Sequence, residues 1–567
     1  MPWDTHSISS VTPATGPAGQ VAHPLAIAHH QRLTRHFYTV GEHAWCLVGN
    51  GLSNQTFVRG PEGIIAIDTG ESIEEMRSAL DELRAVTDEP IVAVIYSHFH
   101  YVAGTQAIFD AQAGKIDVYG HRGIPANLQR FGGEIAARSS RGMVHQFGIS
   151  LPAEGPDGLL HCGLGLHYRN PEHAPFTPGY IRANIEFDST RTYTIAGLTV
   201  EITPAPSDAT DSVTIHFPEL KLAVNNLVWP ALFNIYAIRG EEYRDPRILL
   251  EGIDHIAGLA PEALLGTHGP PLEGAAYVAS SIELYRDSIA FIWDQTVRGA
   301  NQGLTLADLT ARISLPECFA EGYLTQQLYG LVEHHVRQIH SGLFGWFDED
   351  PSHLFALPSA ERARRLIAGF GGADTVRAQI DQALSKADWR WALELATWLV
   401  QKDPQPSPDA PLLAAVLRGI AGHTPSANVR NWCLTRALEL EGSIDLSRHR
   451  QSRFGYQQVL AAAPTHFIPI LRVLVDPERC AGLRGEIAWQ FPGTARVGLA
   501  IRNHVAVPTD GAAADVVLGM SHETWAALLA LRLTFSAGIE QGLIAITGDS
   551  RLGRELLSVF DHAGLNT

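Results

Sequence analysis

Residues 91–104 read IVAVIYSHFHYVAG. The first five are apolar and mostly β-branched, which predicts a short strand buried in a parallel sheet. The chain must turn after this strand, so His98 and His100 can point into one cleft at its carboxyl end, where α/β proteins bind ligands. Neutral imidazole is a frequent metal ligand, and the pair therefore predicts a metal site.

A second segment of the same kind precedes this one. Residues 63–70 read GIIAIDTG, an apolar strand followed by an acid and a turn. We expect Asp68 to orient the metal-binding loop from behind, with Gly70 easing the turn. Two successive strands, each followed by polar residues, favour an α/β fold.

Composition narrows the range of partners. The chain has 567 residues and a net charge of −18, which argues against nucleic acid or an anionic membrane surface as a general partner. It contains no apolar run of about 18 residues that could span a membrane, and no basic segment followed by an apolar run at its start. Its five cysteines are scattered, which predicts reduced thiols in a cytoplasmic protein.

Changes of pattern along the chain predict four regions. Residues 1–30 are expected to be a flexible arm, and 31–275 an α/β catalytic domain with a loop-rich insert at 125–190. In residues 276–450 the apolar positions recur at helical spacing. In residues 465–567 strand-like and helix-like segments alternate. Within the helical region, apolar residues of 378–400 recur at helical spacing, and we expect the tryptophans among them to face the core or a subunit interface.

Several short segments follow one another in a fixed order: GLSNQTF at 51–57, MVHQFG at 143–148, CGLG at 162–165, NIYAIRG at 234–240, YRD at 243–245, TH at 267–268, YG at 329–330 with His334, and GWFD at 345–348. In this order they resemble segments of the alkyl sulfatases of the metallo-β-lactamase superfamily. The resemblance implies an α/β metallo-β-lactamase fold (αββα sandwich) and an α-helical dimerisation domain, hence a homodimer. DVVLGMS at 515–521 and ITGD at 546–549 resemble a small α+β sterol-carrier-like domain, which would offer an apolar surface.

The expected metal site departs from that family. The resemblance implies two zinc ions, but Val102 and Ala103 stand where an Asp and a third His would bind the second. It also implies two later carboxylates, for which Asp208 (or its rival Asp211) and Asn226 are the matching positions, and a late ligand, His268. Because Asn is neutral, we expect one divalent ion per subunit, bound by His98, His100 and Asp208 with His268 and Asn226 nearby. Zinc suits these ligands, and Fe(II) is the alternative.

The remaining site residues are predicted by type and by the resemblance. The guanidinium of Arg244 can donate two parallel hydrogen bonds to a sulfate or carboxylate, unless it pairs with Asp245 or Glu242. Asn54 and Tyr236 are expected as polar walls that bind substrate, and His334 as the proton donor to the leaving oxygen, with His335 facing away. Tyr101 could be a wall, a phenolate ligand or a proton donor, of which the wall is favoured.

Three functions follow from these residues. The first is a metal-dependent hydrolase that attacks an alkyl sulfate or related anionic amphiphile with activated water. The second is a mononuclear non-haem iron oxygenase or other redox enzyme on the same scaffold. A binding protein poor in metal is the third.

Overall fold

The computed structural model describes residues 7–131, 133–229, 235–236, 238–240, 243–320, 322–403, 406–450 and 454–566. The chain divides into two compact units. The first contains the chain up to Pro125 together with Gly142–Ile444, and the second contains Ala126–Arg141 together with the chain from Asp445 onward.

The first unit is built on a seven-stranded sheet in chain order. Its strands are β3 (His36–Val40), β4 (Ala44–Val48), β5 (Gln55–Gly60), β6 (Gly63–Ile67), β7 (Ile91–Ile95), β8 (Asp117–His121) and β9 (Ile185–Phe187). Strands β3–β6 are antiparallel, whereas β6–β9 are parallel. The predicted strand at 91–95 is confirmed as β7, which lies between β6 and β8 and is buried except at Val92.

A second sheet packs against the first. It contains, in order, β10 (Arg191–Ile195), β11 (Leu198–Pro204), β12 (Val213–Phe217), β13 (Leu222–Asn225), β14 (Ala263–Gly266) and β15 (Leu272–Glu273). Residues of both sheets, among them Ile95 and Ile215, form one apolar core. Strands β10 and β11 form a hairpin at Ala196 and Gly197, whose φ angles of +54° and +78° match a tight two-residue turn.

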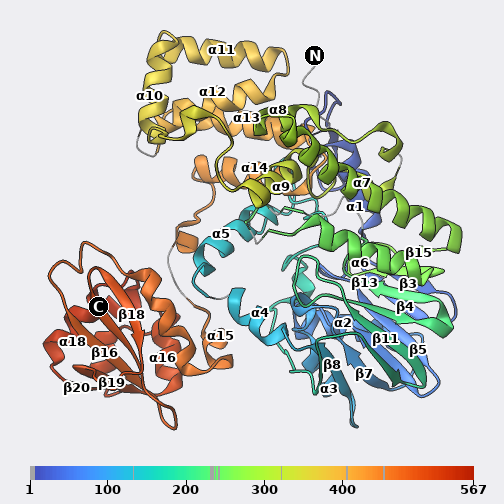
Figure 1. Ribbon diagram of the computed structural model, residues 1–567, viewed down its shortest axis with the longest axis horizontal. Helices are drawn as coiled ribbons and strands as arrows, with labels where there is room; N and C mark the ends of the chain where they lie inside the picture. The colour runs from blue at the N-terminus through green and yellow to red at the C-terminus, as the bar shows by residue number, and fades with distance from the viewer. Residues whose placement is uncertain are drawn as a thin grey trace. The chain divides into compact units, whose positions relative to one another are not determined.

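Helices cover the outer faces of the two sheets (Figure 1). Helices α2 (Ile73–Arg84) and α3 (Thr105–Ala111) pack together, with α2 against β5. Helices α6 (Pro246–Leu259) and α7 (Ala275–Asn301) pack on β14, where Ile253 and Ile282 share a core with Leu264. The first unit therefore contains the αββα sandwich that the sequence predicts.

A helical layer completes the first unit. It contains α8 (Leu306–Arg312), α9 (Val332–Phe344), α10 (Ser359–Gly369), α11 (Ala373–Ser385), α12 (Trp389–Gln401), α13 (Ala410–His423) and α14 (Ala427–Leu440). The helical spacing expected over 378–400 belongs to two helices. The chain turns at Ala387, whose φ is +55°, so α11 and α12 are separate and pack on each other. Trp398 lies in their shared core.

The start of the chain also differs from the prediction. Residues 7–30 are not a flexible arm, since they form β1 (Ala14–Thr15), β2 (Val21–Ala22) and most of α1 (Pro24–Arg32). His29 Nε2 lies 2.7 Å from the carbonyl oxygen of Gly163, and Arg430 Nη2 donates to the carbonyl of Val21 at 3.1 Å. The composition of residues 7–30 did not indicate this ordered structure, because the residues that they contact lie far away in the sequence.

The second unit is an α+β fold. Its five-stranded sheet has the order β18-β17-β16-β19-β20, with β16 (Gly485–Gln490), β17 (Val497–Arg502), β18 (Val505–Thr509), β19 (Val516–Met520) and β20 (Ile544–Gly548). Its helices are α15 (Tyr456–Ala461), α16 (His522–Leu529), α17 (Phe535–Glu540), α18 (Ser550–Ser558) and α19 (Ala563–Asn566). Trp489 of β16 and Trp525 of α16 are fully buried in its core.

Residues 126–141 also belong to this second unit, although the sequence places them in the catalytic domain. They include most of α4 (Ile124–Phe131) and the first half of α5 (Ala136–Gln146). Glu134 forms an ion pair with Arg472, and Ser140 Oγ lies 3.1 Å from His449 Nδ1. The predicted domain 31–275 is thus interrupted. Among the described residues, no helix combines the length and the apolar composition needed to cross a membrane.

Candidate metal centre

The candidate site lies at the carboxyl end of β7, as the sequence predicts. After the strand, Ser97 donates its backbone N–H to Asp68 Oδ1 at 2.8 Å, and its carbonyl accepts from Val213 N at 3.0 Å. His98 is fully extended and begins the short 3₁₀ helix Phe99–Tyr101. This turn brings both imidazoles to the same side, facing the loop between β11 and β12.

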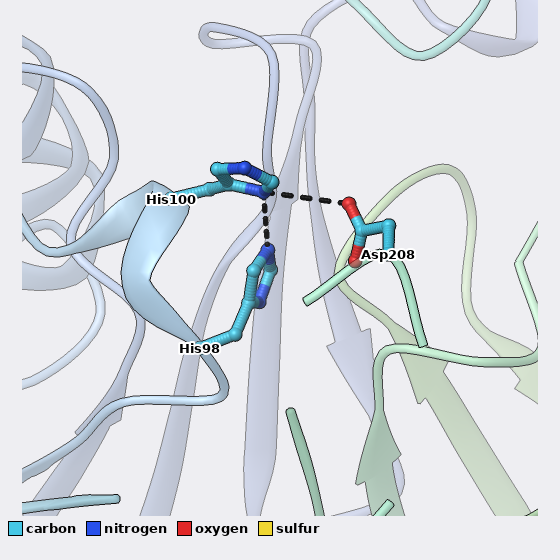
Figure 2. Close-up of side chains that lie close together, drawn as sticks. All are labelled: His98, His100 and Asp208. Carbon is cyan, nitrogen blue, oxygen red and sulfur yellow. Dashed lines mark hydrogen bonds and ion pairs between the residues drawn. The ribbon is translucent and has the colours of Figure 1, made fainter. Parts of the chain in front are cut away.

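Three side chains converge there (Figure 2). His100 Nδ1 lies 3.0 Å from His98 Nε2 and 3.4 Å from Asp208 Oδ2. One donor atom from each residue lies within 4.8 Å of the others, the spacing of a metal-ligand set. The rival, Asp211, is buried but is not a member of this group.

A hydrogen-bonded chain fixes the tautomer of His98. Ser97 Oγ donates to Asp68 Oδ2 at 2.6 Å, so its lone pair accepts from His98 Nδ1–H at 2.8 Å. Burial lowers the pKa of His98 to about 3, so the ring is neutral. Its Nε2 therefore carries a lone pair directed at the cluster, as metal ligation requires. Asp68 supports the loop from behind, as expected, and burial raises its pKa to about 7.

Asp208 supplies the negative charge. Burial alone would raise its pKa, but the hydrogen bond from His100 and the nearby His98 and Arg244 hold the pKa well below its usual range. Two imidazoles and one carboxylate fit a single divalent ion with positions left for water or substrate. The chemistry of these donors thus agrees with a mononuclear centre.

Asn226 does not belong to the ligand set, which corrects its assignment to the metal site. Its Nδ2 donates to Asp208 Oδ1 at 2.6 Å and lies 3.0 Å from the hydroxyls of Ser207 and Ser212. Its Oδ1 accepts from Thr267 Oγ1 at 2.6 Å. The amide oxygen is therefore turned away from the cluster, and Asn226 holds Asp208 in place.

His268 is likewise separate from the three ligands. Its Nδ1–H donates to the carbonyl of Leu52 at 2.9 Å, so Nε2 is the acceptor for the Tyr101 hydroxyl at 3.3 Å. Burial lowers the pKa of His268 to about 4 and raises that of Tyr101 well above its usual range. The pair is thus a neutral imidazole and a neutral phenol. This favours Tyr101 as a wall and disfavours a phenolate ligand.

Arg244 borders the metal cluster. It is buried, and with Asp208 it lines a cavity of about 130 Å³. Burial lowers its pKa to about 10, while Asp208 acts in the opposite direction. The alternative partner Asp245 accepts hydrogen bonds from the side chain of Arg247 and from the first turn of α6. Glu242, the other alternative, lies outside the described residues.

Asn54 is buried and contacts the loop that carries His268. Its side-chain amide donates to the carbonyls of Gly266 at 2.9 Å and Gly269 at 2.8 Å, on either side of His268. These contacts position the His268 loop, and the substrate-binding role of Asn54 stays a prediction. The amide oxygen of Asn54 takes part in neither of these two hydrogen bonds.

Tyr236 and His334 lie together, away from the cluster. Both line a cavity of about 280 Å³ whose described lining contains none of the three ligands. His334 Nε2 lies 3.6 Å from Glu333 Oε1. His335 is fully buried, and its pKa is lowered to about 3 by burial and, to a lesser extent, by the charges of His334 and Arg244. The roles predicted for Tyr236 and His334 stay predictions.

Two other residues were missed as site residues. Ser97 orients His98, and its place directly before the first histidine was the available signal. Arg239 is buried and donates to the Tyr329 hydroxyl at 3.3 Å. Its position in the segment 234–240, which resembles the family, could have indicated it, although Asn234 and Ala237 of that segment lie outside the described residues.

Comparisons with known proteins agree with this architecture. The metallo-beta-lactamase superfamily model matches residues 48–224, the alkyl sulfatase dimerisation model residues 305–443, and the alkyl sulfatase C-terminal model residues 455–566. A structure of a double mutant of a sec-alkyl sulfatase is 25% identical, with a TM-score of 0.82, and the match covers 99% of this chain and 94% of that one. The fold class predicted from the sequence is therefore confirmed.

Curated relatives point the same way. A linear primary-alkylsulfatase from Pseudomonas sp. is 32% identical over 451 residues, which is 77% of this chain and 84% of the relative. An (R)-specific secondary-alkylsulfatase from Pseudomonas sp. is 27% identical, covering 90% of this chain and 78% of the relative. These similarities do not favour the iron oxygenase alternative. The chain belongs to the alkyl sulfatase family of the metallo-β-lactamase superfamily.

Proposed function

We propose that the protein is a metal-dependent hydrolase that cleaves alkyl sulfates or closely related anionic amphiphiles. The observation that carries this proposal is the convergence of His98, His100 and Asp208 beside Arg244. A cation site and a buried guanidinium that line one small region suit a substrate with an anionic head group. Family membership, established above, supports the same reaction class.

The site residues have separate roles in the proposed reaction. His98, His100 and Asp208 would hold a divalent ion, which would supply Lewis-acid chemistry to acidify water and polarise an ester oxygen. The cavity shared by Arg244 and Asp208 is where we place the sulfate, whose oxygens a guanidinium binds in a fork. Asn226 fixes Asp208, and the Asp68–Ser97 pair fixes His98. Because these contacts are formed beforehand, little reorganisation is needed when substrate binds.

We propose one ion per subunit, with zinc as its identity. A second ion would need anionic ligands, but the amide of Asn226 presents its nitrogen, and His268 Nε2 is occupied by Tyr101. Elemental analysis of protein purified without added metal tests this count. Two ions per subunit would refute it, and one iron would revive the oxygenase alternative.

Hydrolysis is tested directly. Protein stripped with a chelator should release no inorganic sulfate from dodecyl sulfate, and zinc added to one equivalent should restore release. Sulfate release that is unaffected by stripping would contradict the metal-dependent reaction. Metal binding without any release would refute the substrate class while leaving the metal centre in place.

We further propose a homodimer that forms through the helical layer. The match to the dimerisation model supports it, and so do side chains on the 343–357 segment that are largely exposed, namely Trp346 (74%) and Phe355 (93%). A monomer at micromolar concentration in light scattering would refute it. The five free cysteines support a reducing, cytoplasmic location, which cell fractionation tests.

A further inference from the structure

Two side chains of the first unit are buried without a hydrogen-bond partner. Among the described residues, none bonds either ring nitrogen of His335 or the hydroxyl of Tyr243. His335 is fully buried, and the oxygen of the half-buried Tyr243 is shielded from solvent. An unpaired buried polar atom costs free energy, and the large majority of such atoms in folded proteins are paired. These two groups therefore point to a ligand that pairs with them.

Helix α9 brings the two groups to one place. His335 and Gly342 are seven residues apart, so they lie on the same face of this helix. The Tyr243 ring packs on Gly342, where an added Cβ atom would lie 2.4 Å from Tyr243 Cε2. The next residue, Arg244, lies close enough to His335 for its charge to act on the imidazole. One face of α9 thus covers the segment that carries the proposed head-group arginine.

The same segment borders the metal cluster. Tyr243 and Arg244 line, together with Asp208, the cavity of about 130 Å³. Arg244 is buried, and Asp208 opposes its charge. This arginine therefore has one unpartnered polar group on its sequence neighbour, which lines the cavity, and another on the helix that covers it.

Both unpartnered groups are uncharged hydrogen-bond donors at neutral pH. Burial lowers the pKa of His335 to about 3, and the charges of His334 and Arg244 act in the same direction. The neutral ring keeps one N–H whichever tautomer forms. Burial raises the pKa of Tyr243 to about 12, so its hydroxyl keeps its proton. Each group can therefore donate to an acceptor, which no described residue provides.

We propose that Arg244, His335 and Tyr243 form a three-donor site for the three terminal oxygens of a sulfate head group. The inference rests on the proposed function for the place of the head group at Arg244, and it adds the two residues that determine specificity there. A carboxylate has only two oxygens and would leave one donor unpaired, which a buried site penalises. The three-donor site would thus select sulfates and sulfonates over carboxylates.

Calorimetric binding to the zinc-loaded protein tests this selection without turnover. Octanesulfonate has three terminal oxygens and no ester bond to cleave, and nonanoate carries the same octyl chain on a carboxylate. Wild type should bind octanesulfonate at least about tenfold more tightly than nonanoate. His335→Leu and Tyr243→Phe should each weaken octanesulfonate binding by about tenfold or more, and nonanoate binding much less, with zinc content unchanged.

Stability separates this role from a purely structural one. Replacing an unpaired buried polar group with an apolar one of similar size removes its desolvation cost. His335→Leu and Tyr243→Phe should therefore not lower the melting temperature of the ligand-free protein. Thr435→Val is the matched control, because Thr435 Oγ1 is also buried without a described partner, on α14, which contributes no residue to the cavity at Arg244. This control should leave the binding of both ligands unchanged.

A conservative variant completes the series. His335→Asn keeps an N–H donor and should retain more octanesulfonate affinity than His335→Leu. Should His335→Leu not fold, as judged by its melting curve, His335→Asn and Tyr243→Phe decide the question, since Tyr243→Phe removes a single oxygen.

A ratio of octanesulfonate to nonanoate affinity that is the same in wild type and in the variants of His335 and Tyr243 would overturn the three-donor site. Selective octanesulfonate binding that depends on both residues, without release of sulfate from dodecyl sulfate, would retain this site and refute the proposed hydrolysis. The two proposals therefore fail in distinguishable ways.

Discussion

Replacing Ser97 with Ala tests whether the residues behind the metal ligands control metal binding. The hydroxyl of Ser97 accepts from His98 Nδ1–H at 2.8 Å and donates to Asp68 Oδ2 at 2.6 Å. Without it, the buried Nδ1–H loses its acceptor, and Asp68 keeps only the backbone donor at 2.8 Å. Loss of such an orienting partner typically costs about 10–100-fold in metal affinity, and each tenfold corresponds to about 1.4 kcal/mol.

Zinc affinity is measured by competition with a chromophoric chelator at fixed pH. Ser288→Ala is the matched control, because Ser288 is also fully buried but donates to the carbonyl of Tyr285 within α7. We expect Ser97→Ala to bind zinc about 10–100-fold more weakly and Ser288→Ala to bind it as wild type does. Wild-type affinity in Ser97→Ala would refute the reasoning that this hydroxyl fixes the His98 tautomer.

Three further outcomes are expected. His98→Ala should lose both metal and activity, whereas His268→Ala should keep its metal and lose activity. If elemental analysis shows equal metal loss in the two variants, His268 belongs to the ligand set. Arg244→Ala should raise KM for dodecyl sulfate by about 10–100-fold, from the lost charged hydrogen bonds, with metal content unchanged; an unaltered KM would exclude Arg244 from head-group binding. The hydrogen bond from His145 holds the pKa of Glu439 at about 2, below its ordinary 4.5. Its stabilisation is therefore present above pH 4.5 and lost as the pH falls toward 2. Glu439→Gln should lower the melting temperature at pH 7 and flatten its fall in that window, and identical melting curves would contradict this.

The fold was predictable where one local pattern determines the structure. The run at 91–95 is apolar on both faces, so burial between two strands was its only stable placement, and the structure confirms it. By contrast, residues 7–30 are ordered by partners such as Gly163 and Arg430, which lie far away in sequence, and their composition alone indicated a flexible arm.

The site was predictable by residue type but not by orientation. His98, His100 and Asp208 could be selected because their side chains ligate metals, and the structure brings them together. The direction of the Asn226 amide depends on hydroxyls of three other residues, so its sequence position could not reveal it. The orientation of His268 could not be predicted from its sequence position either, because its Nε2 accepts a hydrogen bond from the Tyr101 hydroxyl.

The interrupted second unit has a consequence for how the chain is made. Residues 126–141 leave the ribosome long before Asp445 and the strands that complete their unit. At about 5–20 residues per second, that delay is on the order of tens of seconds. During this time residues 126–141 have no other part of their own unit to pack on, while the sequence of the first unit is being completed. A nascent chain stalled before Asp445 should expose residues 126–141 to proteases and chaperones, and a gene shortened at that point would yield a protein that carries this exposed segment permanently.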